Sequence, residues 1–345
     1  MNHHRQYRDY RQSLEDFWSR RANQTRYTYR THIFGHPIDL STNHPGVPQA
    51  LALSKELFTH SARTKKPTFR IQIVQHEPPQ NPGPPPDDLF DVINYAGEAH
   101  WLNLQLASWG NCFIDLEAGA ATAVLSRSLC ERPGLISRCL LNTVLNNFFI
   151  GSGYGMLHAS CLIKQGRALL LMAPHGSGKS TTAMHLVQAG FQLLSDSMVY
   201  VDVVDGNLQL NGFPVGRIKL RSDMLSRFPE LRPYMTSEAV RDETKYVVDL
   251  RQFNPALVSQ EAIYLQSADL CLLTASQERA TFLKPASQAE VWADVMQNSL
   301  YYDTEAIWVR NLANIEGLLS RTRFHHLTVG ADAGGIIAAV QTLWS

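Results

Sequence analysis

A short apolar run that leads straight into a glycine-rich loop constrains the fold more than any other part of this sequence. The run is Arg167–Met172 (RALLLM), with turns at both ends, which is typical of a strand buried on both faces. A helix is expected at Lys179–Ala189, with Gly190 as its C-terminal cap. One strand is expected before this run, at Leu157–Ile163, and another after the helix, near Phe191–Leu194. This order predicts a strand–loop–helix–strand unit of an α/β fold.

The loop itself fits the phosphate-binding pattern known as Walker A. It reads Ala173-Pro174-His175-Gly176-Ser177-Gly178-Lys179-Ser180, with alanine in the first position. Glycines allow main-chain N–H groups to turn inward and approach phosphates closely. The helix that follows points its positive N-terminal end at them.

The residue types after the glycines match the same chemistry. The ammonium of Lys179 can reach the β- and γ-phosphates, and the Ser180 hydroxyl can coordinate Mg²⁺. Thr181 extends the first turn with a further donor. The sequence therefore predicts that Ala173–Thr181 binds a nucleoside triphosphate, ATP with Mg²⁺. The alternative is a glycine-rich turn without a ligand.

An acidic residue follows the next strand. Asp196 lies between two serines just past that strand, one helix and one strand after the loop. A carboxylate there can hold Mg²⁺ or take a hydroxyl proton. The alternative is an ordinary turn aspartate. The sequence contains no N-K-x-D guanine signature, which disfavours a GTPase switch.

These motifs together resemble the catalytic core of the HPr kinase/phosphorylase family. Leu157-His158-Ala159-Ser160, the strand and loop that follow, and Gly190-Phe191-Gln192-Leu193-Leu194-Ser195-Asp196 carry the resemblance. In that family a histidine-containing strand precedes a G-x-S-G-x-G-K-S loop, and a strand ending in Asp-Asp follows. The match covers about Leu157–Val203, with weaker similarity downstream. It resembles most the HPr-kinase-related kinases of unassigned substrate, including the branch called kinase B.

The resemblance implies a fold and an activity. The fold is an α/β kinase core on a mixed sheet flanked by helices, as in the C-terminal domain of phosphoenolpyruvate carboxykinase. The activity is transfer of the γ-phosphoryl group of ATP to a hydroxyl, often that of a serine. The resemblance does not identify the acceptor, which is a protein serine, a peptide or a small molecule.

The same resemblance assigns individual roles. Asp196 matches the first aspartate of the family pair, the proposed base, while Ser197 stands where the second would be. His158 matches the upstream histidine, which acts near the γ-phosphate; its alternative is a strand histidine packed in the core. His175 occupies the serine position of the family loop.

Three cations further along are candidate phosphate or substrate contacts. Arg217 and Lys219 follow a glycine-proline turn and could neutralise transferring phosphate charge. Lys245 lies in a charged segment that resembles a loop of the related kinases, where a basic residue approaches the phosphates. The alternative for Arg217 and for Lys219 is a solvated strand edge.

The remaining chain predicts two regions. Residues 1–126 form an N-terminal helix, expected at 5–24, and a β-rich region with a strand at Thr68–Gln75 and an antiparallel meander over 100–126. Residues 127–345 form the nucleotide-binding kinase domain, which begins with a buried helix at Leu135–Ile150.

Composition excludes several classes of protein. Lys+Arg and Asp+Glu both number 31, so the chain does not have the basic character of a nucleic-acid or membrane-surface binder. Five cysteines without C-x-x-C spacing argue against a zinc knuckle or a disulfide framework and favour free, buried thiols. The polar N-terminus lacks a signal-peptide core, so we expect a cytoplasmic protein; a homo-oligomer stays open.

Two other functions remain. The chain could be a nucleotide-binding regulator or slow ATPase without an acceptor, which Ser197 in place of a second acid favours slightly. It could also be an inactive scaffold that kept the fold. A kinase leaves phosphate on an acceptor, a regulator only binds or hydrolyses the nucleotide, and a scaffold does neither.

Overall fold

The computed structural model describes residues 27–61, 66–76, 82–174, 176–224, 226–240, 243–298 and 304–344. The helix expected at 5–24 and the loop residue His175 lie outside these residues. The chain divides into two compact units. The first is drawn from Met1–Glu56, Ala62–Gly153 and Tyr302–Trp308, and the second from Leu57–Ser61, Tyr154–Tyr301 and Val309–Ser345.

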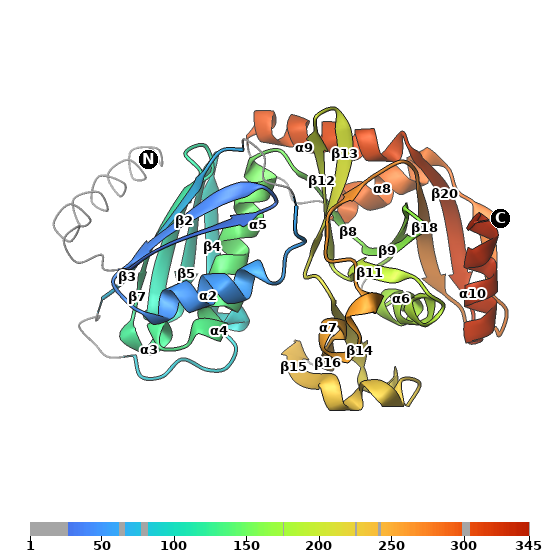
Figure 1. The fold of residues 1–345 in the computed structure, drawn as a ribbon, viewed down its shortest axis with the longest axis horizontal. Coiled ribbons are helices and arrows are strands. Elements are labelled where there is room, and N and C mark those ends of the chain that lie inside the picture. The colour runs from blue at the N-terminus through green and yellow to red at the C-terminus, as the bar shows by residue number, and fades with distance from the viewer. Residues whose placement is uncertain are drawn as a thin grey trace. The chain divides into compact units, whose positions relative to one another are not determined.

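In its described part, the first unit holds one seven-stranded sheet in the order β1-β2-β3-β7-β6-β5-β4 (Figure 1). The bounds are β1 (Tyr27–Ile33), β2 (His36–Thr42), β3 (Phe69–Gln75), β4 (Ile93–Glu98), β5 (Trp101–Leu106), β6 (Gly110–Asp115) and β7 (Ala120–Leu125). Strands β4 to β7 pair antiparallel in sequence order, which confirms the predicted meander, and β3 confirms the strand predicted at 68–75.

Helices pack on this sheet. They are α2 (Gly46–Lys55), α3 (Arg127–Cys130), α4 (Pro133–Ile136), a π-helical turn (Ser137–Leu141) and α5 (Asn142–Gly151). The last three are consecutive and confirm the buried helix predicted at 135–150. Phe148 stacks on Phe69 of β3 with ring centroids 4.7 Å apart, and Phe149 lies 4.6 Å from Phe34.

This packing explains where the two units divide. The sequence places the boundary between residues 126 and 127, whereas the division in the structure follows Gly153. Helix α5 completes the core of the first sheet, so it belongs with the β-rich region. The short segment 57–61 belongs to the second unit, because Thr59 N–H donates to the Gly212 carbonyl and the Leu57 carbonyl accepts from Val215.

The main sheet of the second unit has the order β11-β9-β10-β18-β20-β19 among the described residues. Its strands are β9 (Ser160–Lys164), β10 (Arg167–Met172), β11 (Gln192–Ser195), β18 (Ala268–Ala275), β19 (Phe282–Pro285) and β20 (Thr322–Val329). Strands β10, β18 and β20 are parallel, while β9 and β19 run antiparallel to their neighbours. The predicted mixed sheet of an α/β fold is confirmed.

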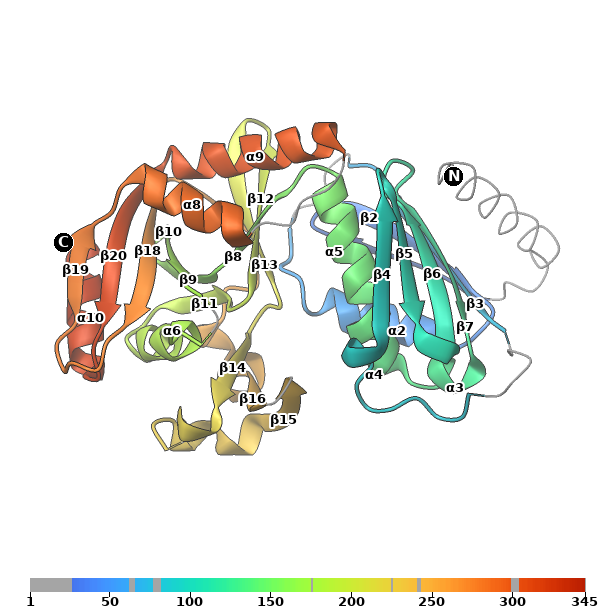
Figure 2. The same cartoon turned by 180° about the vertical axis from the view of Figure 1, so that it is seen from behind.

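Helices cover both faces of this sheet (Figures 1 and 2). They are α6 (Lys179–Gln188) and α10 (Ala333–Gln341) on one face, and α8 (Gln288–Asn298) and α9 (Glu305–Leu319) on the other. The side chains of β10 alternate between the two faces of the sheet, and both faces are apolar, so both must be covered by helices. Leu169 and Leu171 pack in the cluster that contains α6, while Leu170 and Met172 pack in the cluster that contains α8.

Two smaller sheets complete the described part of the second unit. One has the order β17-β13-β12-β8, with β8 (Gly155–His158), β12 (Met198–Val204), β13 (Asn207–Phe213) and β17 (Ile263–Tyr264). The other has the order β14-β16-β15, with β14 (Arg217–Arg221), β15 (Met235–Val240) and β16 (Glu243–Asp249), which α7 (Leu250–Phe253) follows. In both views this three-stranded sheet projects from the rest of the second unit (Figures 1 and 2).

One predicted strand is wrong. The segment 157–163 was expected as a single strand, but it is two strands in different sheets, since His158 pairs with Met198 and Ser160 pairs with Leu171. The side chains of Leu157, Ala159 and Cys161 still alternate into one core, so the pattern contains no signal for the change of sheet.

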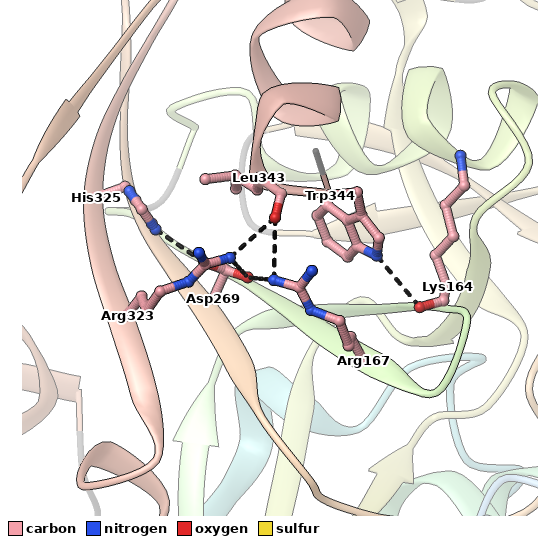
Figure 3. Close-up of polar contacts among 7 residues, drawn as sticks. All are labelled: Lys164, Arg167, Asp269, Arg323, His325, Leu343 and Trp344. Atoms are coloured by element: carbon pink, nitrogen blue, oxygen red, sulfur yellow. Dashed lines mark hydrogen bonds and ion pairs between the residues drawn. The ribbon is translucent and has the colours of Figure 1, made fainter.

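At the opposite end of β10 from the glycine-rich loop, one buried carboxylate joins three parallel strands (Figure 3). Asp269 of β18 is fully buried. It accepts from Arg167 of β10 at 2.8 Å and from Arg323 of β20 at 2.9 and 3.0 Å. The His325 Nε2 lies 2.9 Å from the same carboxylate. His325 therefore has a structural role in this cluster.

The same arginines hold the C-terminal segment. Arg167 and Arg323 both donate to the Leu343 carbonyl, at 3.0 and 2.9 Å. The Arg167 guanidinium lies over the Trp344 ring, 4.9 Å from its centroid, and the Trp344 indole donates to the Lys164 carbonyl (Figure 3). Helix α10, which packs on α6, is thereby tied to the beginning of β10.

Two further expectations concern cysteines and membranes. All five cysteines are free and buried, as predicted. Within the described ranges, every helix is too short or too polar to cross a membrane.

Removing the charge of Asp269 should destabilise the second unit. Loss of one member of a buried ion pair typically costs about 3–5 kcal/mol, because the partner charges are left uncompensated. We therefore expect Asp269→Asn to lower the free energy of unfolding by about 3 kcal/mol in urea titrations. The exposed Glu261, which pairs with His60, provides the control, and Glu261→Gln should leave the urea midpoint nearly unchanged. Equal midpoints for Asp269→Asn and wild type would contradict this role.

Candidate functional site

Three segments of the second unit meet at one edge of its six-stranded sheet. Strand β9 is antiparallel to β10 and β11, so the start of β9 lies beside the ends of both. The register pairs Ser160 with Leu171 and Cys161 with Ser195. The loop after β10 and Asp196 after β11 therefore emerge on either side of Ser160.

The loop has the backbone conformation that its glycines allow. Gly176 and Gly178 have φ angles of +81° and +89°, which non-glycine residues rarely adopt. Gly178 is the N-cap of α6 and has no side chain that could accept from the first turn. The first N–H groups of a helix have no partner within the helix, so this end is suited to an anion. Pro174 and Gly176 are exposed, and Ser177, Ser180 and Thr181 are half-buried.

Lys179, the first residue of α6, lies over this loop. Its Nζ donates to the Ala173 carbonyl at 2.9 Å, and the residue is 9% exposed. Burial lowers the pKa of Lys179; attraction from Asp196 and Asp294 opposes that shift, and repulsion from Lys245 adds to it. An anion bound at the loop would offset the cost of burying the Lys179 charge and would therefore favour the charged form of this lysine.

Asp196 is the most heavily bonded polar group at the site. Its Oδ1 accepts from the Ser160 hydroxyl at 2.6 Å, the Ser180 hydroxyl is a second donor, and the Lys219 main-chain N–H lies 3.5 Å from Oδ2. Burial nevertheless raises the pKa of Asp196, against the effect of these donors and of Lys179. The carboxylate thus joins β11 to β9, α6 and β14.

The site includes an acid that the sequence analysis missed. Asp294 of α8 is close enough to Lys179 to interact with its charge. Burial raises the pKa of Asp294, and Lys179 opposes that shift. Asp294 follows Val291 by three residues, and both Val291 and Val295 pack in the core beneath the end of β10. The 3.6-residue spacing marks this face of α8, but only the tertiary fold places it beside the loop.

His158 lies near Asp196 along the chain pairing, but it belongs to a different sheet from the one expected. The sequence indicates a strand before the loop strand for His158 and a strand after it for Asp196. In the structure β11 neighbours β9, and β8 belongs to another sheet. His158 is half-buried at the end of β8 and pairs with Met198, two residues after Asp196. The segment 158–160 therefore runs beside 195–198 at the site edge.

The three downstream cations lie on the three-stranded sheet. Arg217 is 3.8 Å from Asp249, which Arg251 also binds at 2.6 Å. Lys219 approaches Asp196 through its main chain, and Lys245 acts on Lys179 through its charge. Ser197, which replaces a second acid, donates its N–H to the Ser195 hydroxyl.

The residues present fit a phosphate-bearing ligand with Mg²⁺. Mg²⁺ is usually held by one or two protein oxygens, together with substrate phosphates and water. The Ser180 hydroxyl and the Asp196 carboxylate, which contact each other, could supply those oxygens. The open N-terminus of α6 and Lys179 could hold the phosphates.

The sequence matches no family model and no curated protein. Among solved structures, it is similar to the Hpr(Ser) kinase/phosphatase from Coxiella burnetii, with a TM-score of 0.28 and 9% identity. That similarity covers 55% of this chain and 95% of the Coxiella burnetii chain.

The raised pKa of Asp196 predicts a pH-dependent stability difference. The folded protein should hold a proton on Asp196 above the ordinary value of 3.8, so it binds more protons than the unfolded chain there. Wild-type stability should therefore fall as the pH rises from 3.8 towards the folded pKa. Asp196→Asn lacks this dependence, so its unfolding free energy minus that of wild type should increase with pH.

Urea titrations from pH 4 to 7 in EDTA, without nucleotide, measure this difference. The control is Asp205→Asn, in an exposed turn where Asp205 has a φ of +50° that asparagine also tolerates. A difference for Asp196→Asn that stays constant or shrinks as the pH rises would show that burial does not raise the pKa of this carboxyl.

Proposed function

We propose that this chain is an ATP-dependent kinase, resembling the HPr kinase type, that transfers the γ-phosphoryl group to a hydroxyl. The observation that carries the proposal is the meeting of Lys179, Ser180 and Asp196 at the open N-terminus of α6. A cation, a metal-binding hydroxyl and a carboxylate at one helix N-terminus are the parts that phosphoryl transfer requires.

Most of the catalysis is positioning and charge neutralisation. Bound ATP–Mg²⁺ supplies the phosphoryl group and the metal charge. The N–H groups of the loop and of the first turn of α6, together with Lys179, bind the phosphates. Ser180 and Asp196 bind the metal. Because Lys179 is mostly buried, its charge acts in a low-dielectric setting and is screened less than at the surface.

Asp196 orients the acceptor hydroxyl and takes its proton. The hydroxyl oxygen forms a bond to the γ-phosphorus, the bond from that phosphorus to the β,γ-bridging oxygen breaks, and ADP leaves with the electron pair. Beside Mg²⁺ this carboxylate would stay ionised, because the charge of the metal favours the anion, so it could accept the proton. Ser160 holds it in place through the 2.6 Å hydrogen bond, and His158 is a second candidate for the proton.

Asp294 bears on the alternative of a nucleotide-binding regulator or slow ATPase. Ser197 leaves a single acid at the end of β11, which favours a regulator. Asp294, however, brings a second carboxylate close to Lys179 from α8. This second acid is a further candidate for the metal or the acceptor hydroxyl, so the loss at residue 197 does not by itself exclude phosphoryl transfer. The acceptor is a protein serine, a peptide or a small molecule.

Nucleotide binding should depend on Lys179. A ligand that binds only the folded state raises the melting temperature, so ATP with Mg²⁺ should stabilise the wild-type protein. Lys179→Ala should remove most of that rise and still fold without nucleotide. The exposed Lys284 provides the control, and Lys284→Ala should keep the full rise. An equal rise in Lys179→Ala would overturn the assignment of the loop.

Phosphoryl transfer should depend on Asp196. Incubation with γ-labelled ATP, Mg²⁺ and a lysate of proteins and small molecules should yield a labelled acceptor. Loss of a general base typically lowers the rate by about two to four orders of magnitude. We therefore expect Asp196→Asn to lose transfer by that factor, while Asp205→Asn matches wild type.

Nucleotide affinity separates the two roles of this carboxylate. If Asp196 acts mainly as the base, affinity for ATP–Mg²⁺ is kept in Asp196→Asn; if it mainly holds the metal, affinity falls as well. Wild-type transfer by Asp196→Asn would rule out both roles. Nucleotide binding or hydrolysis without any labelled acceptor would favour the regulator.

A further inference from the structure

Strand β4 is the last strand of the seven-stranded sheet, and its outer side pairs with no other strand among the described residues (Figure 2). Residues 94–97 of this strand are exposed. An edge strand presents unpaired main-chain N–H and C=O groups, and proteins usually protect such an edge with lysine, proline or a bulge. The sequence of β4, INYAGE, contains neither lysine nor proline, and its register with β5 is regular. This edge therefore has none of the usual protection against pairing with another strand.

The register fixes which residues of β4 face outward. The His100 carbonyl accepts from the N–H of the residue that follows β6, so the main chain of His100 faces β6. Main-chain groups of successive strand residues point alternately to the two neighbouring strands, so Asn103 faces β4. Asn103 pairs with Ala96, whose main chain therefore bonds to β5. Tyr95 and Gly97, on either side of Ala96, present their N–H and C=O groups to the outer side.

A cavity of about 140 Å³ lies beside this edge, between the sheet and α5. Leu102, Leu104 and Ile114 form its apolar wall, and Thr143 and Asn147 of α5 line the opposite side. Among the described residues that line the cavity, none is charged. An engineered apolar cavity of about 150 Å³ is large enough to bind benzene. The cavity beside β4 could therefore hold one uncharged aliphatic or aromatic side chain.

Gly97 connects the outer edge to this cavity. Directly opposed residues of an antiparallel pair have their side chains on the same face of the sheet. Gly97 is opposite Leu102 and Tyr95 is opposite Leu104, so both β4 positions lie on the cavity face. The Tyr95 side chain hydrogen-bonds to that of Thr143. Because Gly97 has no side chain, a residue that pairs with it from outside could place its own side chain in the cavity.

We propose that β4 binds an extended segment of a partner polypeptide by strand addition, with one uncharged aliphatic or aromatic side chain of that segment in the cavity. In strand addition, main-chain hydrogen bonds supply affinity, and pockets for alternate side chains supply specificity. Tyr95 and Gly97 supply the first, and the cavity beside them supplies the second. The inference goes beyond the proposed kinase function and does not depend on it, because β4 and α5 lie in the first unit.

Short synthetic peptides test this surface on the full-length protein. The probes are capped, fluorescein-labelled heptapeptides of threonine with a central leucine, valine or phenylalanine, because threonine favours the extended conformation and adds no charge. A further peptide has a central aspartate. Two more carry N-methyl groups on one or the other alternate set of residues of the leucine peptide, which removes those main-chain donors. Fluorescence anisotropy reports the affinity.

We expect at least one of the three hydrophobic peptides to bind. The aspartate peptide should bind about tenfold or more weakly, because burial of an apolar side chain is lost and an unpaired charge would have to be buried. N-methylation of one alternate set should abolish binding, and N-methylation of the other set should be tolerated, because only every second residue of an added strand bonds to β4.

Two pairs of variants test the edge and the cavity separately. Tyr95→Pro removes an outward N–H, which an edge strand tolerates, whereas Tyr95→Ala keeps it. Gly97→Val places a side chain on the cavity face, whereas Ala96→Val places the same side chain on the opposite face. Tyr95→Pro and Gly97→Val should each weaken binding about tenfold or more, and Tyr95→Ala and Ala96→Val should retain most of it. Melting temperatures show whether each variant folds; if Gly97→Val does not, Thr143→Leu fills the same cavity from α5.

The proposal is overturned if no hydrophobic peptide binds, if the aspartate peptide binds equally well, or if Tyr95→Pro and Gly97→Val both keep wild-type affinity. A wild-type dimer that Tyr95→Pro dissociates would assign the edge to a second copy of this chain instead. A melting temperature that falls in Tyr95→Pro and not in Tyr95→Ala, together with no peptide binding, would assign the edge to the chain's own residues outside the described ranges. Either result would also overturn the partner polypeptide.

Discussion

The second unit depends on how a buried carboxylate, Asp196, is compensated. A buried charge is tolerated only when hydrogen bonds or opposite charges replace the water it has lost. Hydroxyls from Ser160 and Ser180 bind Asp196, and the Lys219 N–H approaches it. These partners come from β9, α6 and β14, so satisfying one charge fixes three elements around the same point. The proposed chemistry uses the group that organises this edge of the sheet.

The two ends of β10 have different roles: residues at its beginning stabilise the fold, and residues at its end form the candidate site. At the beginning of β10, Asp269 is fully buried and bound to Arg167 and Arg323, which also hold the C-terminal segment. At the end of β10, the N-cap Gly178 has no side chain to accept the first N–H groups of α6, and burial lowers the pKa of Lys179. A closed ion cluster favours stability, whereas a helix N-terminus beside a buried lysine is suited to binding an anion.

Electrostatic balance also connects the loop to the three-stranded sheet. Attraction to Asp196 and Asp294 partly offsets the cost of burying the Lys179 charge, whereas repulsion from Lys245 adds to that cost. In the proposed reaction, the phosphates of ATP would bring negative charge to the buried Lys179.

The sequence by itself determined the local unit from β10 to α6, because an apolar run, glycines with left-handed backbone angles and a helix N-terminus are encoded within some twenty consecutive residues. It also determined the meander of the first unit and the buried helix after it, through their periodicity. Only the tertiary structure decided that α5 completes the first sheet, that β8 and β9 belong to different sheets, and that Asp294 lies near Lys179. These features rest on contacts between residues far apart in the chain, where each segment's own pattern is compatible with several partners, and the packing of the whole core selects one.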